Sequence, residues 1–198
     1  MFVLNAPTFY YDFNSPYAYL AASRIDAMLP VPASWEPIAF AFVLVARARS
    51  PWSMHEQTRD DGMRECERRA TSYGLPELRW PPGWPVESYS LTSLRAAYVA
   101  AEHGQLKEFT AAAFARNFAE GRGLAELDDV LAVAVLAGLP EAPVREGVQR
   151  PDIKAALKAN TDQAIARGIY GVPTVATADE LFWGDDQLEA AATALRSP

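Results

Sequence analysis

Ser15 is the residue whose type and position best suggest chemistry. It ends the aromatic stretch "FYYDFN" and is followed by Pro16, where a helical pattern begins. Serine is a leading N-cap residue, and proline is favoured at the first helical position. The first N–H groups of a helix have no intrahelical acceptor and lie at its positive end, so this position also stabilises an anion. Ser15 is therefore either a cap worth about 1 kcal/mol or a hydroxyl that acts on a bound ligand.

The elements around Ser15 indicate a mixed α/β start. Residues 2–13 are rich in aromatic and β-branched side chains and predict a strand. Residues 16–29 place apolar side chains at helical spacing and predict a helix that ends before Pro30 and Pro32. The stretch "ASWEPIAFAFVLV" predicts a second strand that runs into irregular chain, with Pro37 at an edge or a bend.

The middle of the chain is helical. We expect five consecutive helices without an intervening strand, over residues 54–73, 90–103, 106–120, 126–137 and 143–149. The proline- and tryptophan-rich stretch "LRWPPGWPVESYS" predicts a loop between the first two.

Strand character returns near the C-terminus. Residues 152–167 predict a helix, "TVAT" and "LFW" predict a hairpin, and residues 185–195 predict a last helix. The order β-α-β, helices, α-β-β-α is that of an α/β thioredoxin-like fold with an all-helical insertion. We therefore expect a discontinuous thioredoxin-like domain, residues 1–45 and 151–198, and a helical insertion domain, residues 46–150.

Composition excludes several classes of protein. Of the 198 residues, half are hydrophobic and 22% are charged, and the net charge is −7. This negative charge argues against binding to nucleic acid or to an anionic membrane surface. We expect no membrane partner, because no apolar run is long enough to span a bilayer and no signal-peptide pattern is present. A single cysteine, Cys66, fits a reducing cytoplasm. Its neighbours Glu65 and Glu67 should raise the pKa of its thiol, so Cys66 is expected to be a helix residue rather than a nucleophile.

The other familiar catalytic patterns are missing from the sequence. His55 and His103 lie in separate segments, neither at ligand spacing from a carboxylate or thiol, so we expect no metal. Neither a G-x-S-x-G elbow nor a P-loop is present.

Two stretches, "FYYDFNSPYAYLAA" and "ARGIYGVPTVATADELFWGDDQLEAA", resemble the 2-hydroxychromene-2-carboxylate isomerases and their relatives, the kappa-class glutathione transferases. These families belong to the DsbA-like branch of the thioredoxin superfamily. The "YGLP…WPPGWPV" segment is similar to them as well, so the resemblance spans almost the whole chain. It implies a small aromatic substrate, glutathione as the bound thiol and a homodimer.

The resemblance also assigns candidate site residues. Where a redox enzyme of this fold has Cys-x-x-Cys, this chain has Ser15, Pro16, Tyr17 and Ala18, which excludes dithiol–disulfide exchange by the chain alone. Glutathione can supply the missing thiol, and a thiolate at a helix N-terminus has a lowered pKa. Ser15 would donate its hydroxyl to that sulfur as the catalytic residue, beside Pro16.

The same resemblance implies two more contacts with glutathione. Pro173 would be cis and face the first helix, so that the backbone of Val172 pairs with the cysteinyl part. Asp186 would contact the γ-glutamyl amine, and backbone N–H groups at Asp185 and Asp186 would hold its carboxylate. The residues alone allow two plainer interpretations: a Val-Pro step that enters an edge strand, and an aspartate that caps the last helix.

The chain departs from this family between its second strand and the insertion. Relatives carry a Thr-Gly-Asn-x-Pro segment and a nearby lysine, where this chain has "ARARSPWSMHEQ". Arg47 or Arg49 either replaces that cation or is a solvated surface charge. The loop residues Trp80, Trp84 and Tyr89 either line an aromatic pocket or pack the loop onto the core.

The resulting hypothesis is a glutathione-dependent isomerase acting on an aromatic unsaturated keto acid. The thiolate would add to the conjugated carbon, allow rotation about the former double bond and then leave. The alternatives are a kappa-like glutathione transferase, which shares the first step, and a non-catalytic binding module.

Overall fold

The computed structural model describes residues 6–196 and contains a four-stranded sheet in the order β2-β1-β3-β4. Strand β1 pairs in parallel with β2 and antiparallel with β3, which pairs antiparallel with β4. The strands are β1 (Thr8–Tyr11), β2 (Ser34–Pro37), β3 (Thr174–Ala176) and β4 (Leu181–Trp183). The predicted hairpin is confirmed, and the part of the first predicted strand at residues 2–5 lies outside the described residues.

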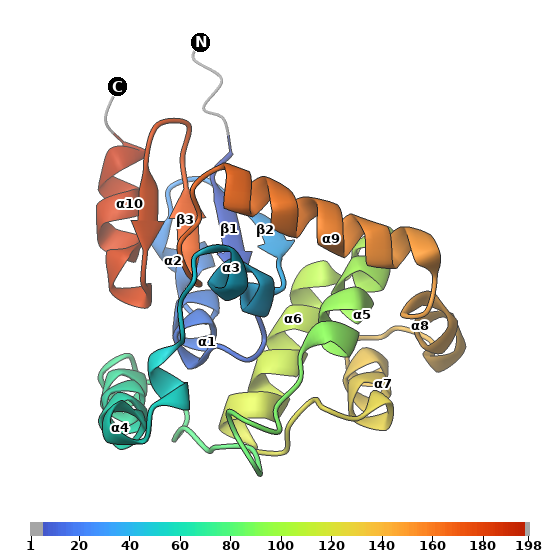
Figure 1. Ribbon diagram of the computed structural model, residues 1–198. Helices are drawn as coiled ribbons and strands as arrows, with labels where there is room; N and C mark the ends of the chain where they lie inside the picture. Colours follow the sequence, from blue (N-terminus) through green and yellow to red (C-terminus); the bar gives the residue numbers. More distant parts are fainter. Residues whose placement is uncertain (1–5, 197–198) are drawn as a thin grey trace.

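The helices surround this sheet (Figure 1). Those before and after the central block are α1 (Pro16–Ala22), α2 (Ile25–Met28), α3 (Phe40–Ala46), α9 (Pro151–Ala166) and α10 (Leu188–Ala194). The central block contains α4 (Glu56–Ser72), α5 (Leu91–Glu102), α6 (Leu106–Phe114), α7 (Leu127–Leu136) and α8 (Glu141–Gly147). Short turns η1 (Trp52–Met54) and η3 (Asp185–Gln187) are 3₁₀, and η2 (Ala115–Ala119) continues α6 as a π-helix.

The chain thus has the predicted thioredoxin-like fold with many added helices, and α4 to α8 match the five predicted helices. In Figure 1, α4 and α5 to α8 lie on opposite sides of α1. The division into domains at residues 45 and 150 stays a prediction. Among residues 6–196, no helix combines the length and apolar character needed to cross a membrane.

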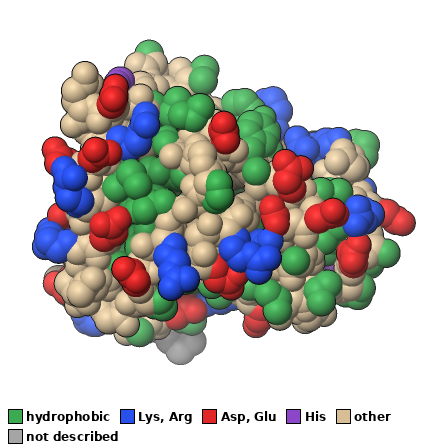
Figure 2. Space-filling view, turned by 90° about the horizontal axis from the view of Figure 1, so that it is seen from below, with side chains coloured by type: hydrophobic (Ala, Val, Ile, Leu, Met, Phe, Trp, Pro, Cys, Tyr) green, Lys and Arg blue, Asp and Glu red, His purple; other side chains and the backbone are tan. Residues whose placement is uncertain are grey.

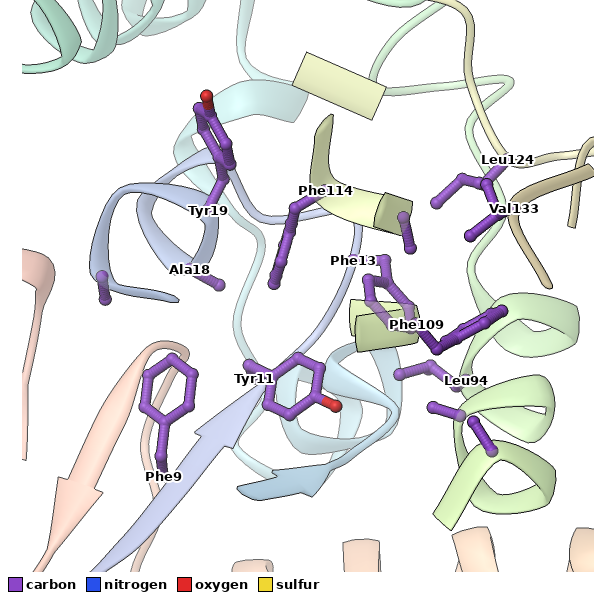
Figure 3. Close-up of a cluster of buried hydrophobic side chains, with 14 of the residues drawn as sticks. Phe9, Tyr11, Phe13, Ala18, Tyr19, Leu94, Phe109, Phe114, Leu124 and Val133 are labelled. Carbon is purple, nitrogen blue, oxygen red and sulfur yellow. The ribbon is translucent and has the colours of Figure 1, made fainter. Parts of the chain in front are cut away.

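The two faces of the sheet bury two different apolar clusters. Side chains of a strand alternate between its faces, so Phe9 and Tyr11 enter the larger cluster while Tyr10 enters the smaller one with Ile169 and Val172. Figure 3 shows the larger cluster, where aromatic rings from β1, α1 and α6 meet. The Tyr11 hydroxyl lies 2.8 Å from Oγ1 of Thr110. Both clusters reach the C-terminal end of β1, so the chain that follows it toward Ser15 is anchored on both sides.

Two predicted elements differ in the structure. The helix over residues 16–29 is broken between α1 and α2, because Ser23 donates its hydroxyl to the Tyr19 carbonyl and the Arg24 N–H bonds the Ala21 carbonyl. The irregular chain after the second strand is instead helix α3. Its first N–H groups are bonded from other segments: Phe40 N–H donates to the Asp12 carboxylate at 2.9 Å, and Ala39 N–H donates to Thr161.

Candidate functional site

One cavity of about 910 Å³ lies between α1, α3, the loop before α5 and the turn before β3. The residues that the resemblance assigns to glutathione line it: Ser15, Pro16, Val172, Pro173, Asp185 and Asp186. In the view from below, hydrophobic side chains gather around a hollow whose borders carry acidic and basic side chains (Figure 2). The fold therefore brings the motif at Ser15 together with two motifs from near the other end of the chain, while the roles of these residues stay a prediction.

Ser15 has the geometry of an N-cap and also a second hydrogen bond, to the segment that contains the cis proline. Its Oγ accepts a hydrogen bond from the Ala18 N–H at 3.2 Å and donates to the Val172 carbonyl at 3.3 Å. The peptide bond between Val172 and Pro173 is cis, as the resemblance implies. An O–H···O hydrogen bond is normally 2.5–3.0 Å long, so the bond to Val172 is weak. The hydroxyl proton of Ser15 is therefore available to a better acceptor.

Asp12 is a polar residue of the cavity lining to which the sequence motifs assign no role. Its side chain is buried, and its carboxylate accepts from the N–H groups of Asn14 and Phe40, both at 2.9 Å. Burial raises its pKa above the ordinary aspartate value, while these hydrogen bonds and one from Ser90 oppose the rise. Asp12 thereby joins the starts of α1, α3 and α5 around the cavity. A lone acid at the end of an aromatic strand was the signal for it in the sequence.

The second predicted helix start is arranged differently from the first. Gly184 gives no side-chain cap to η3, and α10 begins only at Leu188. Asp185 is 1% exposed and is bound by Arg69 at 2.7 Å and by the Tyr73 hydroxyl at 3.0 Å. Burial raises the pKa of Asp185, and the two partners oppose that rise. The expectation of an aspartate cap is therefore wrong for Asp185, because its carboxylate is turned to the insertion helix α4.

Asp186 is about half exposed at the rim of the cavity. Its carboxylate lies 3.5 Å from Arg69, and Arg69 is also paired with Asp185 and with Glu65. Arg69 has no local signal in the sequence, and its place is set by packing of α4 against α1 and by its ion pairs with Asp185 and Asp186.

Aromatic side chains form much of one wall. Trp84 and Tyr89 line the cavity, as one of the two interpretations of the loop expects, and so do Tyr17 and Trp52. Trp80 instead packs against Trp84, with 4.5 Å between ring centroids, and donates its indole N–H to Glu67. The loop is tied to the start of α1 because Trp84 donates to the Asn14 carbonyl and Asn14 is bonded to Ser88.

The two arginines after α3 have different surroundings. Arg47 donates to the carbonyls of Ile165 and Ile169 and lies outside the cavity lining. Arg49 lines the cavity. Neither arginine is merely a solvated surface charge.

Cys66 is fully buried in α4, and burial, more than the nearby carboxylates of Asp185 and Glu65, raises the pKa of its thiol to about 12. It is thus a packed helix residue, as predicted. His55 lines the cavity, and residues 6–196 contain no group of three or more metal-ligating side chains.

With this geometry, the chain can be placed among known proteins. The model of the DSBA-like thioredoxin domain family matches residues 8–196, and the chain belongs to that family. This confirms the fold and the DsbA-like membership that the resemblance implied.

Two relatives named 2-hydroxychromene-2-carboxylate isomerase are similar along most of their length. The protein from Sphingobium xenophagum is 26% identical over 186 residues, covering 91% of this chain and 93% of its own. The protein from Pseudomonas putida is 26% identical over 187 residues, covering 91% and 89%.

Solved structures give the same fold. A 2-hydroxychromene-2-carboxylate isomerase superposes with a TM-score of 0.84 at 24% identity, covering 96% of this chain and 94% of that one. The cytosolic disulfide reductase DsbM from Pseudomonas aeruginosa, solved with GSH, has a TM-score of 0.66 at 19% identity, covering 98% and 100%.

Proposed function

We propose that this protein is a glutathione-dependent isomerase of the 2-hydroxychromene-2-carboxylate isomerase type, acting on an aromatic unsaturated keto acid. The observation that carries the proposal is the position of the Ser15 hydroxyl. It lies at the start of α1, weakly bonded to Val172, in a cavity with aromatic walls. The names of the two relatives support an isomerase.

Glutathione would enter by exchanging hydrogen bonds at Ser15 and Val172. The Ser15 O–H is directed to the Val172 carbonyl at 3.3 Å. A sulfur placed beside Ser15 would accept that proton instead, since a thiolate is a stronger acceptor than a carbonyl already held at a long distance. The carbonyl is then free to accept the cysteinyl N–H of the ligand, as when a peptide adds to a strand. One displacement thus prepares both contacts.

The remaining contacts orient the thiol. The half-exposed Asp186 carboxylate is available to the γ-glutamyl amine, whereas Asp185 already has two close partners. Trp52, Trp84 and Tyr89 offer stacking surfaces for an aromatic substrate next to the sulfur. DsbM, a protein of the same fold, is solved with GSH, which makes glutathione the first thiol to test.

The chemistry is nucleophilic catalysis with a bound nucleophile. The thiolate adds to the conjugated carbon, and the electron pair of the double bond moves to the carbonyl oxygen as an enolate. The former double bond now rotates as a single bond. For 2-hydroxychromene-2-carboxylate, which is a cyclic hemiketal, ring opening to the hydroxyaryl keto acid precedes the addition, and the hemiketal proton passes to the phenol oxygen. Collapse of the enolate then re-forms the double bond and expels the thiolate, so that glutathione is regenerated and no atoms are gained or lost.

The test is a calorimetric titration of glutathione into the wild type and Ser15→Ala at pH 8, with ultraviolet detection of the bound thiolate. We expect saturable binding with proton release in the wild type. In Ser15→Ala the bound thiol should titrate about 1–2 pH units higher, because a hydrogen bond to a charged acceptor contributes about 1.5–3 kcal/mol.

Activity is measured on 2-hydroxychromene-2-carboxylate with and without glutathione, followed by mass spectrometry. An isomer of unchanged mass supports the isomerase, whereas a glutathione adduct would identify a transferase. If the wild type binds no glutathione, the mechanism is wrong and Ser15 is only a cap.

A further inference from the structure

Arg49 is fixed in place by the end of helix α3. The helix closes with Ala48 at a φ of 50°, a left-handed conformation uncommon for alanine. The Arg49 N–H bonds the Leu44 carbonyl at 2.9 Å, and the Ala48 N–H bonds the Val45 carbonyl. This is the bonding pattern of a helix C-cap in which the chain reverses. The reversal directs Arg49 to the segment that precedes the cis proline.

There the guanidinium group rests on an aromatic platform. Its central carbon lies 3.6 Å from the ring centroid of Tyr170 and 5.4 Å from that of Trp183. The two rings meet edge to face at 4.9 Å, and Nη1 of Arg49 donates to the Tyr170 carbonyl at 2.7 Å. An arginine stacked in this way is already ordered, so a ligand that binds it has less side-chain entropy to remove.

The charges around the cavity leave Arg49 without an anionic partner. Two arginines line the cavity, Arg49 and Arg69. Arg69 is paired with Glu65, Asp185 and Asp186, whereas no ion pair joins Arg49 to a carboxylate anywhere in residues 6–196. A guanidinium has five N–H donors in a planar fork that matches a carboxylate. Its known bond to the Tyr170 carbonyl uses only one of them.

We propose that Arg49 is the carboxylate-binding residue of this cavity. The identity of the ligand rests on the proposed function, but the recognition chemistry does not. Tyr170, which holds Arg49, lies two residues before Val172, where the cysteinyl part of glutathione would pair. The carboxylate of the adjoining glycyl residue is within reach of this position, since one extended residue spans about 3.5 Å. The carboxylate of the keto acid is the other source of the same chemistry.

The proposal is tested with Arg49→Gln and Arg49→Lys. Arg64→Gln is the matched control, because Arg64 is 67% exposed on α4, is paired with Asp61 and is not part of the cavity lining. Each protein is titrated with glutathione and with its glycyl ethyl ester. We expect Arg49→Gln to weaken glutathione binding about 10-fold, which is a common effect of losing a charged hydrogen bond. The ester lacks only the glycyl carboxylate, so its affinity for the wild type and for Arg49→Gln should be equal.

Arg49→Lys separates charge from geometry. It keeps the positive charge but loses the planar fork, so its affinity for glutathione should lie between those of the wild type and Arg49→Gln. Circular dichroism and melting temperatures confirm that the variants are folded.

The substrate arm uses 2-hydroxychromene-2-carboxylate and its methyl ester. A rise of about 10-fold in KM for the acid alone, with glutathione binding unchanged, assigns the carboxylate to the substrate and supports the proposal. If Arg49→Gln binds both acids as tightly as the wild type does, the proposal is overturned. If the wild type binds no glutathione, the proposed function fails separately, and tryptophan fluorescence with cinnamate and cinnamamide still tests whether Arg49 prefers the acid.

Discussion

The two helix starts that border the cavity, at Ser15 and at Asp185, use their polar groups in opposite ways. Ser15 makes hydrogen bonds of 3.2 and 3.3 Å and lies beside the cis proline. Asp185 is fully buried and has charged or hydroxyl donors at 2.7 and 3.0 Å from α4. Both were predicted from the sequence as ligand contacts, yet only one of them has a weakly held group.

The difference separates a residue that is available to a ligand from one that holds the site together. A polar group bound tightly inside the protein offers a ligand little, because the existing bonds must be broken first. Ser15 can exchange a long bond for a better one, whereas Asp185 connects the insertion helix α4 to the start of the last helix. Asp186, next in the chain, remains half exposed beside it.

The largest effect should come from Ser15→Ala. Removing a donor aimed at developing or bound negative charge costs about 10²- to 10³-fold in rate, and loss of the cap adds about 1 kcal/mol of destabilisation. We expect kcat/KM for 2-hydroxychromene-2-carboxylate to fall by that factor at saturating glutathione, with a small fall in melting temperature. Ser72→Ala, at an exposed serine that ends α4 outside the cavity lining, is the control. Full activity in Ser15→Ala would show that Ser15, like Asp185, has only a structural role.

Asp185→Ala should mainly affect stability. It leaves the Tyr73 hydroxyl and part of the Arg69 guanidinium without their partner, at a cost of about 2–3 kcal/mol. Asp185→Asn should lose less, because the amide keeps an acceptor oxygen and because burial already disfavours the charged form, as the raised pKa shows. Urea unfolding monitored by tryptophan fluorescence measures both. Equal losses in the two variants would contradict this interpretation.

Much of the framework was predictable because it rests on local patterns. The hairpin, the five consecutive helices and the serine–proline helix start follow from periodicity and cap residues near in sequence. Helix α3 was missed for the opposite reason: its first N–H groups are bonded by Asp12 and Thr161, which are far away in the chain. A run such as "FAFVLVA" has no local signal that distinguishes the helix from a strand.

The same limit applies to the site. Ser15, Val172 and Asp186 belong to short motifs, so the sequence brought them forward. Arg69 and Arg49 have their roles only through α4 packing on α1 and through the rings of Tyr170 and Trp183. Partners of this kind are set by tertiary contacts, which no window of residues contains.

Gly171→Ala should have an intermediate effect. A Cβ at this position would overlap the indole ring of Trp183, 2.7 Å from its Cε2 atom, so the ring must move. Overpacking of this kind costs about 1–3 kcal/mol. Since Trp183 also contacts Tyr170, we expect weaker glutathione binding together with a lower unfolding midpoint. Gly74→Ala, where nothing lies within 4 Å but φ is +70°, is the control for backbone strain without crowding. Unchanged glutathione binding in Gly171→Ala would show that the position of Trp183 does not matter for the ligand site.

The smallest change in stability should come from Asp186→Asn, and it sharpens the comparison most. The Asp186 carboxylate is 52% exposed and lies 3.5 Å from Arg69, and exposed ion pairs contribute about 0–1 kcal/mol. The unfolding midpoint should therefore stay within error of the wild type, in contrast to Asp185→Ala. Glutathione binding should nevertheless weaken several-fold, because the γ-glutamyl amine loses its anionic partner, and calorimetry measures that loss. If the γ-glutamyl amine instead contacts Asp185, the two variants should exchange their effects on glutathione binding. Asp185→Asn would then remain folded but lose binding, whereas Asp186→Asn would retain it.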